Sequence, residues 1–165
     1  MRTSTSSNAV RTRSQGAHGS RDGHREQDTA TSAVGLSQAA ASLERADRAL
    51  VEARTEIHAD RRYVSAHVAA LRATAAVLSV RTRPQSMRRQ TNAWVLLERV
   101  APELAEWAAF FAAGAAKRAA AEAGHVRVVS DRDADDLVRD VEQFLRVVER
   151  LVGLPERLDL ATGAS

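Results

Sequence analysis

The sequence predicts an all-α protein, built as an antiparallel up-and-down bundle of four long helices. In four successive segments, apolar residues recur three and four positions apart, which is the spacing of one helix face. No segment shows the strict alternation of apolar and polar residues that is typical of a half-buried strand. Proline, glycine and clustered polar residues separate the segments, so we expect short connections between the helices.

The first two helices are expected between residue 32 and a loop that starts at residue 81. In the first, Leu36, Leu43, Leu50 and Ile57 recur every seven residues with alanines between them, which predicts one apolar seam along a helix of about 25 residues. Asp60 is expected to cap the second helix. The seam predicted for the second helix consists of Val64, Val68, Leu71, Ala75 and Leu78.

The third helix is expected to follow the stretch "RTRPQSMRRQ" at residues 81–90, where Pro84 interrupts the helical pattern. Thr91 offers an N-cap, and Gly124 ends the helix. Because Pro102 lies inside the seam and lacks a backbone N–H, the helix either kinks or divides there. The predicted seam consists of Trp94, Leu97, Ala101, Leu104, Ala108, Phe111 and Ala115.

The fourth helix is expected to start at Ser130, because Ser130 and Asp133 have the spacing of a capping box. Gly153 suits the position after its last turn. The acids of "SDRDADD" at 130–136 fall in the first turns, where the helix dipole favours negative charge, so capping explains them better than a cation site does. The predicted seam consists of Leu137, Val141, Phe144, Val148 and Leu151.

The bundle is expected to occupy residues 32–153. Residues 1–31 are rich in Ser, Thr, Gly, Arg and His, and Val10 is their only larger aliphatic residue. Such a segment buries too little apolar area to offset its ordering entropy, which predicts a disordered, basic tail. Residues 154–165 are expected to form a second, flexible tail.

Composition excludes several kinds of site. The chain has no cysteine, which rules out disulfides, thiolate nucleophiles and cysteine-ligated metals. It contains no GxxxxGKS/T, GxGxxG, HExxH or GxSxG motif, and its five histidines do not form a zinc-binding pattern, so we expect no cofactor and no metal. The longest apolar run, residues 107–116, is about half a bilayer span, and no apolar signal segment is present. We therefore expect a cytoplasmic protein with no membrane partner.

Charge is distributed unevenly, although the formal net charge is only +3. Residues 60–90 contain seven arginines and one acid, whereas residues 131–142 contain six acids and two arginines. The basic segment can hold an RNA backbone, meet the acidic segment of a second copy, or simply be solvated. The candidate nucleic-acid-binding residues are Arg61, Arg81, Arg83, Arg88 and Arg89.

Arg62 and His67 form an R-x4-H pair at the start of the second helix. Five positions turn a helix by about 140°, so the two side chains are not expected to converge within one straight helix. With the predicted seam facing the core, His67 is expected to be half-buried on its flank and Arg62 to point away. The two side chains can meet if Arg62 curls back or if both face a second subunit.

Three stretches show a family resemblance: "RRYVSAHVAALRATAAVL", "AWVLLERVAPELAEWAAFFAAGAAKRAAAEAG" and "DADDLVRDVEQFL". They resemble the HEPN domain (higher eukaryotes and prokaryotes nucleotide-binding), and in particular its small stand-alone SAV-type members from GC-rich bacteria. The resemblance covers about residues 36–152. It implies a helical bundle that often pairs two-fold.

The resemblance implies two alternative functions. In catalytic HEPN members, R-x4-6-H residues of both subunits line one cleft and cut RNA without metal; Arg62 would then stabilise charge on the phosphate and His67 would act as acid–base. Catalytic members often have a polar residue directly after the arginine, where this chain has Tyr63. Because many HEPN domains only bind or dimerise, we expect a non-catalytic nucleotide-, RNA- or protein-binding and dimerisation module. The alternative is a metal-independent endoribonuclease, as in toxin-like or defence effectors.

A homodimer is expected for a separate reason. The alanines and valines of the second helix extend beyond one helix face, which leaves apolar surface for a second copy. Other expected partners are RNA, a nucleotide or another protein.

Overall fold

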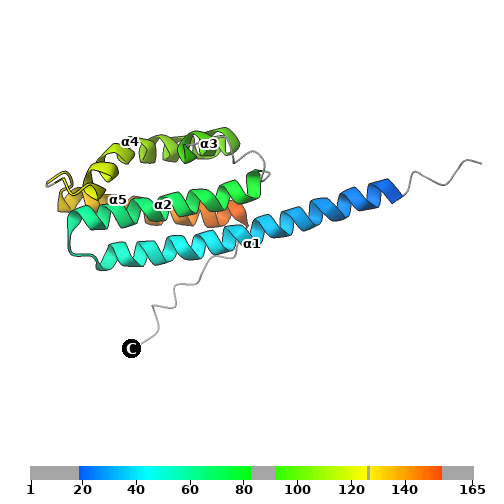
Figure 1. The fold of residues 1–165 in the computed structure, drawn as a ribbon, viewed down its shortest axis with the longest axis horizontal. Helices are drawn as coiled ribbons and strands as arrows, with labels where there is room; N and C mark the ends of the chain where they lie inside the picture. Colours follow the sequence, from blue (N-terminus) through cyan, green and yellow to red (C-terminus); the bar gives the residue numbers. More distant parts are fainter. Residues whose placement is uncertain (1–18, 83–91, 126, 154–165) are drawn as a thin grey trace, which may run out of the picture. The chain divides into compact units, whose positions relative to one another are not determined.

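The structure, a computed structural model, describes residues 19–82, 92–125 and 127–153, with side chains described from residue 30 onward (Figure 1). The chain divides into two compact units, Met1–Ala33 and Val34–Ser165. Every regular element in the described ranges is helical, which confirms the predicted all-α class. These elements are α1 (Gly19–Thr55), α2 (Ala59–Arg81), α3 (Ala93–Val100), the 3-10 helix η2 (Pro102–Leu104), α4 (Ala105–Glu122) and α5 (Asp131–Val152).

Helix α1 begins earlier than the sequence predicted. Residues 19–31, which we expected to belong to a disordered tail, are helical. The prediction considered only buried apolar area, but each residue added to a nucleated helix gains a backbone hydrogen bond. Gly23 is the only glycine or proline between residues 20 and 34, so little opposes elongation there. Residues 1–18 and the predicted tail at 154–165 lie outside the described residues.

The third predicted helix is divided at Pro102, one of the two outcomes expected from the sequence. Helix α3 ends before Ala101, whose φ of −140° and ψ of 72° leave the helical region. Pro102 starts η2, and α4 follows directly. The described residues therefore form five α-helices instead of four. The seam still continues across the break: Trp94, Leu97, Ala101, Leu104, Ala108 and Phe111 are buried as predicted, and Ala115 is partly buried.

Helix α5 follows the prediction closely. The Ser130 hydroxyl accepts a hydrogen bond from the Asp133 N–H at 3.1 Å, and the Asp133 carboxylate accepts one from the Ser130 N–H at 3.1 Å, so the capping box is present. Gly153 ends the helix with a left-handed φ of 68°. The buried seam contains Leu137, Val141, Phe144 and Val148, and Leu151 is partly buried.

Two predicted caps were wrong by one or two positions. Helix α3 is capped by Asn92, whose side chain accepts a hydrogen bond from the Trp94 N–H at 3.0 Å; Thr91 lies outside the described residues. Helix α2 is preceded by His58, which makes no side-chain cap. Asp60 instead lies in the first turn of α2, where its negative charge interacts favourably with the helix dipole.

Helix α2 is the central helix of residues 34–165. It packs against α3, α4 and α5, and Arg72 on α2 donates a hydrogen bond to the carbonyl of Arg45 on α1 at 2.9 Å (Figure 1). By length and apolar composition alone α2 is also long enough to cross a bilayer, a test that the core helix of a soluble protein passes equally well. Part of its apolar surface, whose breadth suggested a dimer, is buried within the chain, and the dimer stays a prediction.

The buried faces of the first two helices were only partly predicted. In the α1 seam, Leu43 and Leu50 are buried, but Leu36 and Ile57 are exposed. In the α2 seam only Leu78 is buried, whereas Val64, Val68, Leu71 and Ala75 are half-buried. Because alanine occurs on several faces of α2, side-chain size did not distinguish them. The face that is buried contains Tyr63, Ala66, His67, Ala70, Ala73, Thr74 and Val77.

Candidate functional site

Arg62 joins the start of α2 to the start of α5. Its Nη2 lies 2.7 Å from a carboxylate oxygen of Asp131, and its Nε lies 3.1 Å from one of Asp135. Its Nη1 donates to the carbonyl of Glu56 at 2.9 Å, in the turn before α2. The side chain is only 14% exposed. Arg62 therefore does not point away from the fold, as the sequence suggested, because α5 brings two carboxylates to it.

His67 lies in the core, not on the flank of α2. It is 1% exposed, and the rings of Trp94 and Phe111 meet it edge-on, with centroids 5.5 Å and 6.1 Å from the His67 centroid. Burial lowers the pKa of His67, and the hydrogen bond to Phe111 opposes that shift only in part. The expected half-buried position was wrong because α2 turns its alanine face, and His67 with it, toward α4.

The hydrogen bond of His67 fixes its tautomer. Its Nε2 lies 3.0 Å from the main-chain carbonyl oxygen of Phe111. A carbonyl oxygen only accepts, so Nε2 bears the hydrogen and Nδ1 keeps its lone pair. Among the described residues the buried Nδ1 has no hydrogen-bond partner. His67 is thus a neutral ring that connects α2 to α4.

Arg62 and His67 have no partner in common. Arg62 contacts α5 and the turn before α2, whereas His67 contacts α3 and α4. This agrees with the sequence expectation that the two side chains diverge on one helix. Within one chain they do not face the same space, and what the pair does in an assembly stays a prediction.

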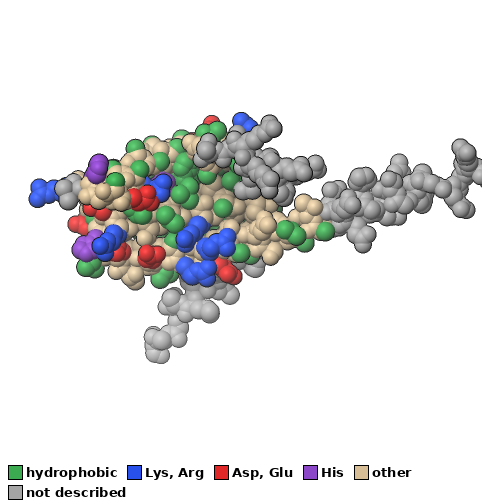
Figure 2. All heavy atoms as spheres, in the orientation of Figure 1, with side chains coloured by type: hydrophobic (Ala, Val, Ile, Leu, Met, Phe, Trp, Pro, Cys, Tyr) green, Lys and Arg blue, Asp and Glu red, His purple; other side chains and the backbone are tan. Residues whose placement is uncertain are grey.

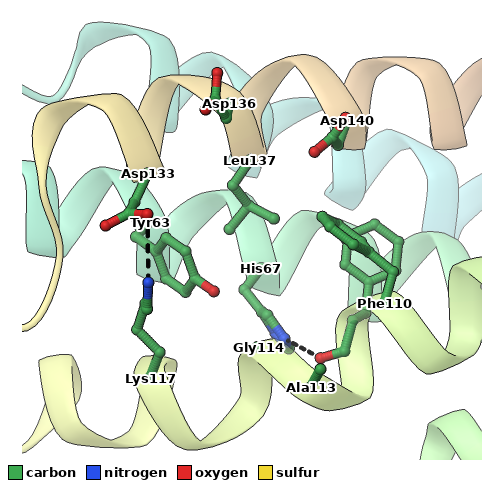
Figure 3. A pocket seen from close by; sticks show the side chains of 11 residues that line it. Tyr63, His67, Phe110, Ala113, Gly114, Lys117, Asp133, Asp136, Leu137 and Asp140 are labelled. Carbon is green, nitrogen blue, oxygen red and sulfur yellow. Dashed lines mark hydrogen bonds and ion pairs between the residues drawn. The ribbon is translucent and has the colours of Figure 1, made fainter.

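Beside His67 lies a pocket of about 420 Å³ between α2, α4 and α5 (Figure 3). Its wall combines aromatic rings, small residues of α4 and three aspartates of α5. The lining residues are Tyr63, His67, Phe110, Phe111, Ala113, Gly114, Lys117, Asp133, Asp136, Leu137 and Asp140.

One end of the pocket already holds a cation. The Lys117 ammonium lies 3.4 Å from a carboxylate oxygen of Asp133 and 5.9 Å from the centre of the Tyr63 ring. Hydrogen bonds from the Ser130 backbone and hydroxyl lower the pKa of Asp133, and Lys117 lowers it further. Burial raises the pKa of Tyr63, and the nearby Asp133 charge adds to that shift. At neutral pH the lowered pKa keeps Asp133 ionised and the raised pKa keeps the Tyr63 phenol neutral.

Gly114 is required where Tyr63 and His67 approach α4. A Cβ at position 114 would lie 2.8 Å from the Tyr63 hydroxyl oxygen and 3.6 Å from the His67 ring. Non-bonded heavy atoms essentially never come within 3.0 Å of a Cβ. Glycine therefore leaves the space in which the Tyr63 hydroxyl lies.

Asp140, at the other end of the pocket, has no cation bound to it. Burial raises its pKa, and the charge of Asp136 raises it further. Among the described residues no hydrogen bond or ion pair joins the Asp140 carboxylate to another side chain, whereas Asp136 pairs with Arg132 and Arg139. Asp140 is therefore a partly desolvated carboxylate beside an open cavity.

The expected nucleic-acid-binding arginines do not form a described patch. Arg61 is exposed on the first turn of α2. Arg81, at the end of α2, pairs with Glu103 at 2.9 Å. The remaining three, Arg83, Arg88 and Arg89, lie outside the described residues. The described ranges also contain no group of three or more His, Cys, Asp or Glu side chains that could hold a metal ion.

Part of the pocket wall was predictable from the sequence. Asp133, Asp136 and Asp140 are spaced three and four positions apart, so they lie on one face of α5. We interpreted the acids of residues 130–136 as capping residues, which is right for Asp133, and counted Asp140 only in the acidic segment 131–142. Phe110 gave no separate signal, because an aromatic residue next to Phe111 in an apolar run looks like core.

Comparison with known proteins gives one result. A family model described as SAV_6107-like HEPN matches residues 53–149, more than half of the chain. The match includes α2, α3, η2, α4 and most of α5, and it covers every residue that lines the pocket. No curated protein and no solved structure matches the chain. The chain therefore belongs to the SAV_6107-like HEPN family, as its three resembling stretches predicted.

Proposed function

We propose that this protein is a non-catalytic HEPN module that binds a protein partner, and that a second copy of the chain is one such partner. The observation that carries the proposal is the placement of His67. It is 1% exposed, and its one hydrogen-bearing nitrogen is bonded to the carbonyl of Phe111. A general acid–base must come within about 3 Å of the proton that it transfers. His67 lies in the wall of the pocket, but it is almost fully covered and its Nε2 is bonded to the Phe111 carbonyl, so it is poorly placed for that contact.

The electrostatics support the same conclusion. A neutral histidine with a lowered pKa cannot act as the acid that protonates a leaving oxygen near pH 7. The charge of Arg62 is already balanced by Asp131 and Asp135, so it is not available to a phosphate. The neighbouring pocket is lined by three aspartates and one lysine, and that lysine is already paired with Asp133, so the pocket is a poor site for a phosphate group.

The outer face of α4 suits a protein partner. Phe110 is 45% exposed, and the exposed alanines of this helix recur three and four positions apart. Figure 2 shows hydrophobic side chains over the part of the molecule that α4 occupies in Figure 1. Small side chains let a partner helix approach closely, and exposed apolar patches are typical of interaction sites. The exposed alanines are Ala109, Ala112, Ala113, Ala116 and Ala119.

The homodimer is tested through this face. Two copies that meet by the same face form a closed two-fold dimer. Ala112→Glu and Ala116→Glu place charges in the proposed interface and are expected to shift the protein toward monomer in light scattering after size exclusion at tens of micromolar. Ala33→Glu makes the same change at an exposed position of α1 and serves as control. A wild-type monomer at this concentration contradicts self-association.

The alternative, a metal-independent endoribonuclease, is tested by incubating the full chain with mixed RNA in excess EDTA. We expect no cleavage. His67→Gln is the matched variant, because its amide N–H can still donate to the Phe111 carbonyl while losing acid–base function. Cleavage by the wild type that this variant lacks would overturn the proposal, and cleavage by both would indicate a contaminating nuclease. If the chain binds RNA or a nucleotide without cleaving it, that ligand would replace the protein partner in this proposal.

The remaining expectations belong to the same proposal. We propose that residues 32–153 act as the binding module. In this proposal α3, η2 and α4 together take the place of the third helix of an antiparallel up-and-down four-helix bundle. We also propose that the module acts in the cytoplasm of a bacterium, without a membrane partner.

A further inference from the structure

Each end of the pocket combines an aspartate with an aromatic residue, and the lysine of the lining lies at the first end. At one end, Figure 3 shows Lys117 joined to Asp133 and lying near the Tyr63 ring. At the other end lie Asp140 and Phe110, with Leu137 and His67 between the two ends (Figure 3). The first end shows what this arrangement binds within the chain itself, namely an ammonium group held by a carboxylate near an aromatic face.

At the second end no described side chain forms an ion pair with Asp140, and burial and the charge of Asp136 raise its pKa by more than the charge of the neighbouring Arg139 lowers it. Asp140 is partly desolvated, and it has no ion pair among the described residues. Phe110 is 45% exposed, although a phenylalanine that only filled the core would be covered. A carboxylate that loses part of its hydration without gaining a partner costs free energy, and a bound cation would recover it.

We propose that the Asp140–Phe110 end of this pocket binds a guanidinium group, as presented by an arginine side chain of the protein partner. The inference rests on the proposed function, because it names the chemistry by which that partner is recognised. A guanidinium donates two hydrogen bonds to one carboxylate and stacks its flat face on an aromatic ring. The pocket volume of about 420 Å³ leaves room for the side chain behind the charged group.

Other ligand classes fit less well. A phosphate or carboxylate ligand meets the Asp140 carboxylate at this end of the pocket, while the one lysine of the lining, Lys117, is paired with Asp133 at the other end. A bare metal ion needs several oxygen or nitrogen ligands, and the described residues contain no such cluster. An organic cation instead uses both the charge of Asp140 and the apolar surface of Leu137 and Phe110.

The pocket is also continuous with the α4 face. Phe110 and Ala113 belong both to the pocket wall and to the exposed apolar surface of α4. A partner that lies along α4 can therefore reach the pocket with a long side chain. Arginine has the length and the flat charged head that such a position requires.

The test is a titration of the isotope-labelled full chain with N-acetyl-arginine amide, followed by backbone amide chemical shifts. We expect dissociation constants of roughly millimolar order, as for a fragment-sized ligand, with shifts concentrated at residues of the pocket. Asp140→Asn is expected to weaken binding about tenfold, because it removes the charge from a charge-assisted hydrogen bond. Phe110→Ala is expected to weaken it about threefold, by losing the ring.

The controls separate the site from general charge. Glu98→Gln removes one exposed carboxylate of α3 that does not line the pocket, and it should leave the dissociation constant unchanged. N-acetyl-glutamate amide and inorganic phosphate should give no shifts in the pocket. Equal affinity in the wild type and Asp140→Asn, or pocket shifts with phosphate, would overturn the proposal.

Butylguanidinium distinguishes the source of the cation. If it binds as well as the capped arginine, the guanidinium itself is what the pocket recognises. If it binds and the capped arginine does not, a free small cation is the ligand and the partner side chain is refuted. Failure of the light-scattering test while arginine amide still binds would remove self-association and leave the pocket proposal intact.

Discussion

The contacts of Arg62 lead to a prediction that separates a structural arginine from a catalytic one. Arg62→Met keeps most of the aliphatic stem but removes the guanidinium. The change breaks the hydrogen bond to the Glu56 carbonyl and the two ion pairs to Asp131 and Asp135. We expect the variant to be less stable, because α2 and α5 lose their polar connection at this end of the bundle.

The magnitude follows from the exposure of each partner. The hydrogen bond from a charged group that is 14% exposed is worth about 1.5 kcal/mol. The carboxylates of Asp131 and Asp135 are 81% and 55% exposed, so each ion pair is worth only about 0.5 kcal/mol. Together the loss is about 2–3 kcal/mol, which lowers the melting temperature of a domain of this size by about 6–12 °C.

Urea unfolding followed by circular dichroism measures this loss in free energy. Arg61→Met is the matched control, because Arg61 is the neighbouring, exposed arginine of the same helix turn. It should change the free energy of unfolding by less than about 0.5 kcal/mol. If Arg62→Met and Arg61→Met have equal stability, the contacts of Arg62 do not support the fold, and the side chain is available for another role.

Three further predictions concern the pocket and the core. Burial lowers the pKa of His67, so the unfolded chain binds a proton that the folded chain does not. The free energy of unfolding should therefore fall as the pH drops below about 6.5. His67→Gln should reduce this pH dependence in unfolding curves measured between pH 7 and 5. Asp140 has a raised pKa, so the stability that its neutral form gives is present in acid and is lost as the pH rises. Asp140→Asn should therefore raise the melting temperature at pH 7 but not at pH 3. Equal shifts at both pH values would contradict this assignment. Gly114→Ala should destabilise by about 1 kcal/mol, because overpacking against the Tyr63 hydroxyl outweighs the better helix propensity of alanine. In a Tyr63→Phe background the same change should stabilise by up to about 1 kcal/mol, and a double-mutant cycle without coupling would refute the steric argument.

The sequence alone determined the buried face of the helices whose large apolar residues lie in a single stripe. From Trp94 to Phe111 and from Leu137 to Val148, the predicted and buried residues agree almost completely. The capping box at Ser130 was also local enough to predict. In these segments the side chains alone distinguish the inner face from the outer face, because only one face is bulky and apolar. The family followed from the same stretches.

The tertiary structure decided the face of α2 and with it the environment of the candidate site. Alanines occur on several faces of that helix, so burial depended on where α3, α4 and α5 pack. His67 entered the core because Phe111 on α4 offers a carbonyl to it, and Arg62 is held because α5 starts beside it. Periodicity gives the direction of a side chain around its own helix, but only the position of other helices gives it a partner. For this reason the sequence predicted that Arg62 and His67 diverge, but it did not predict what each of them contacts.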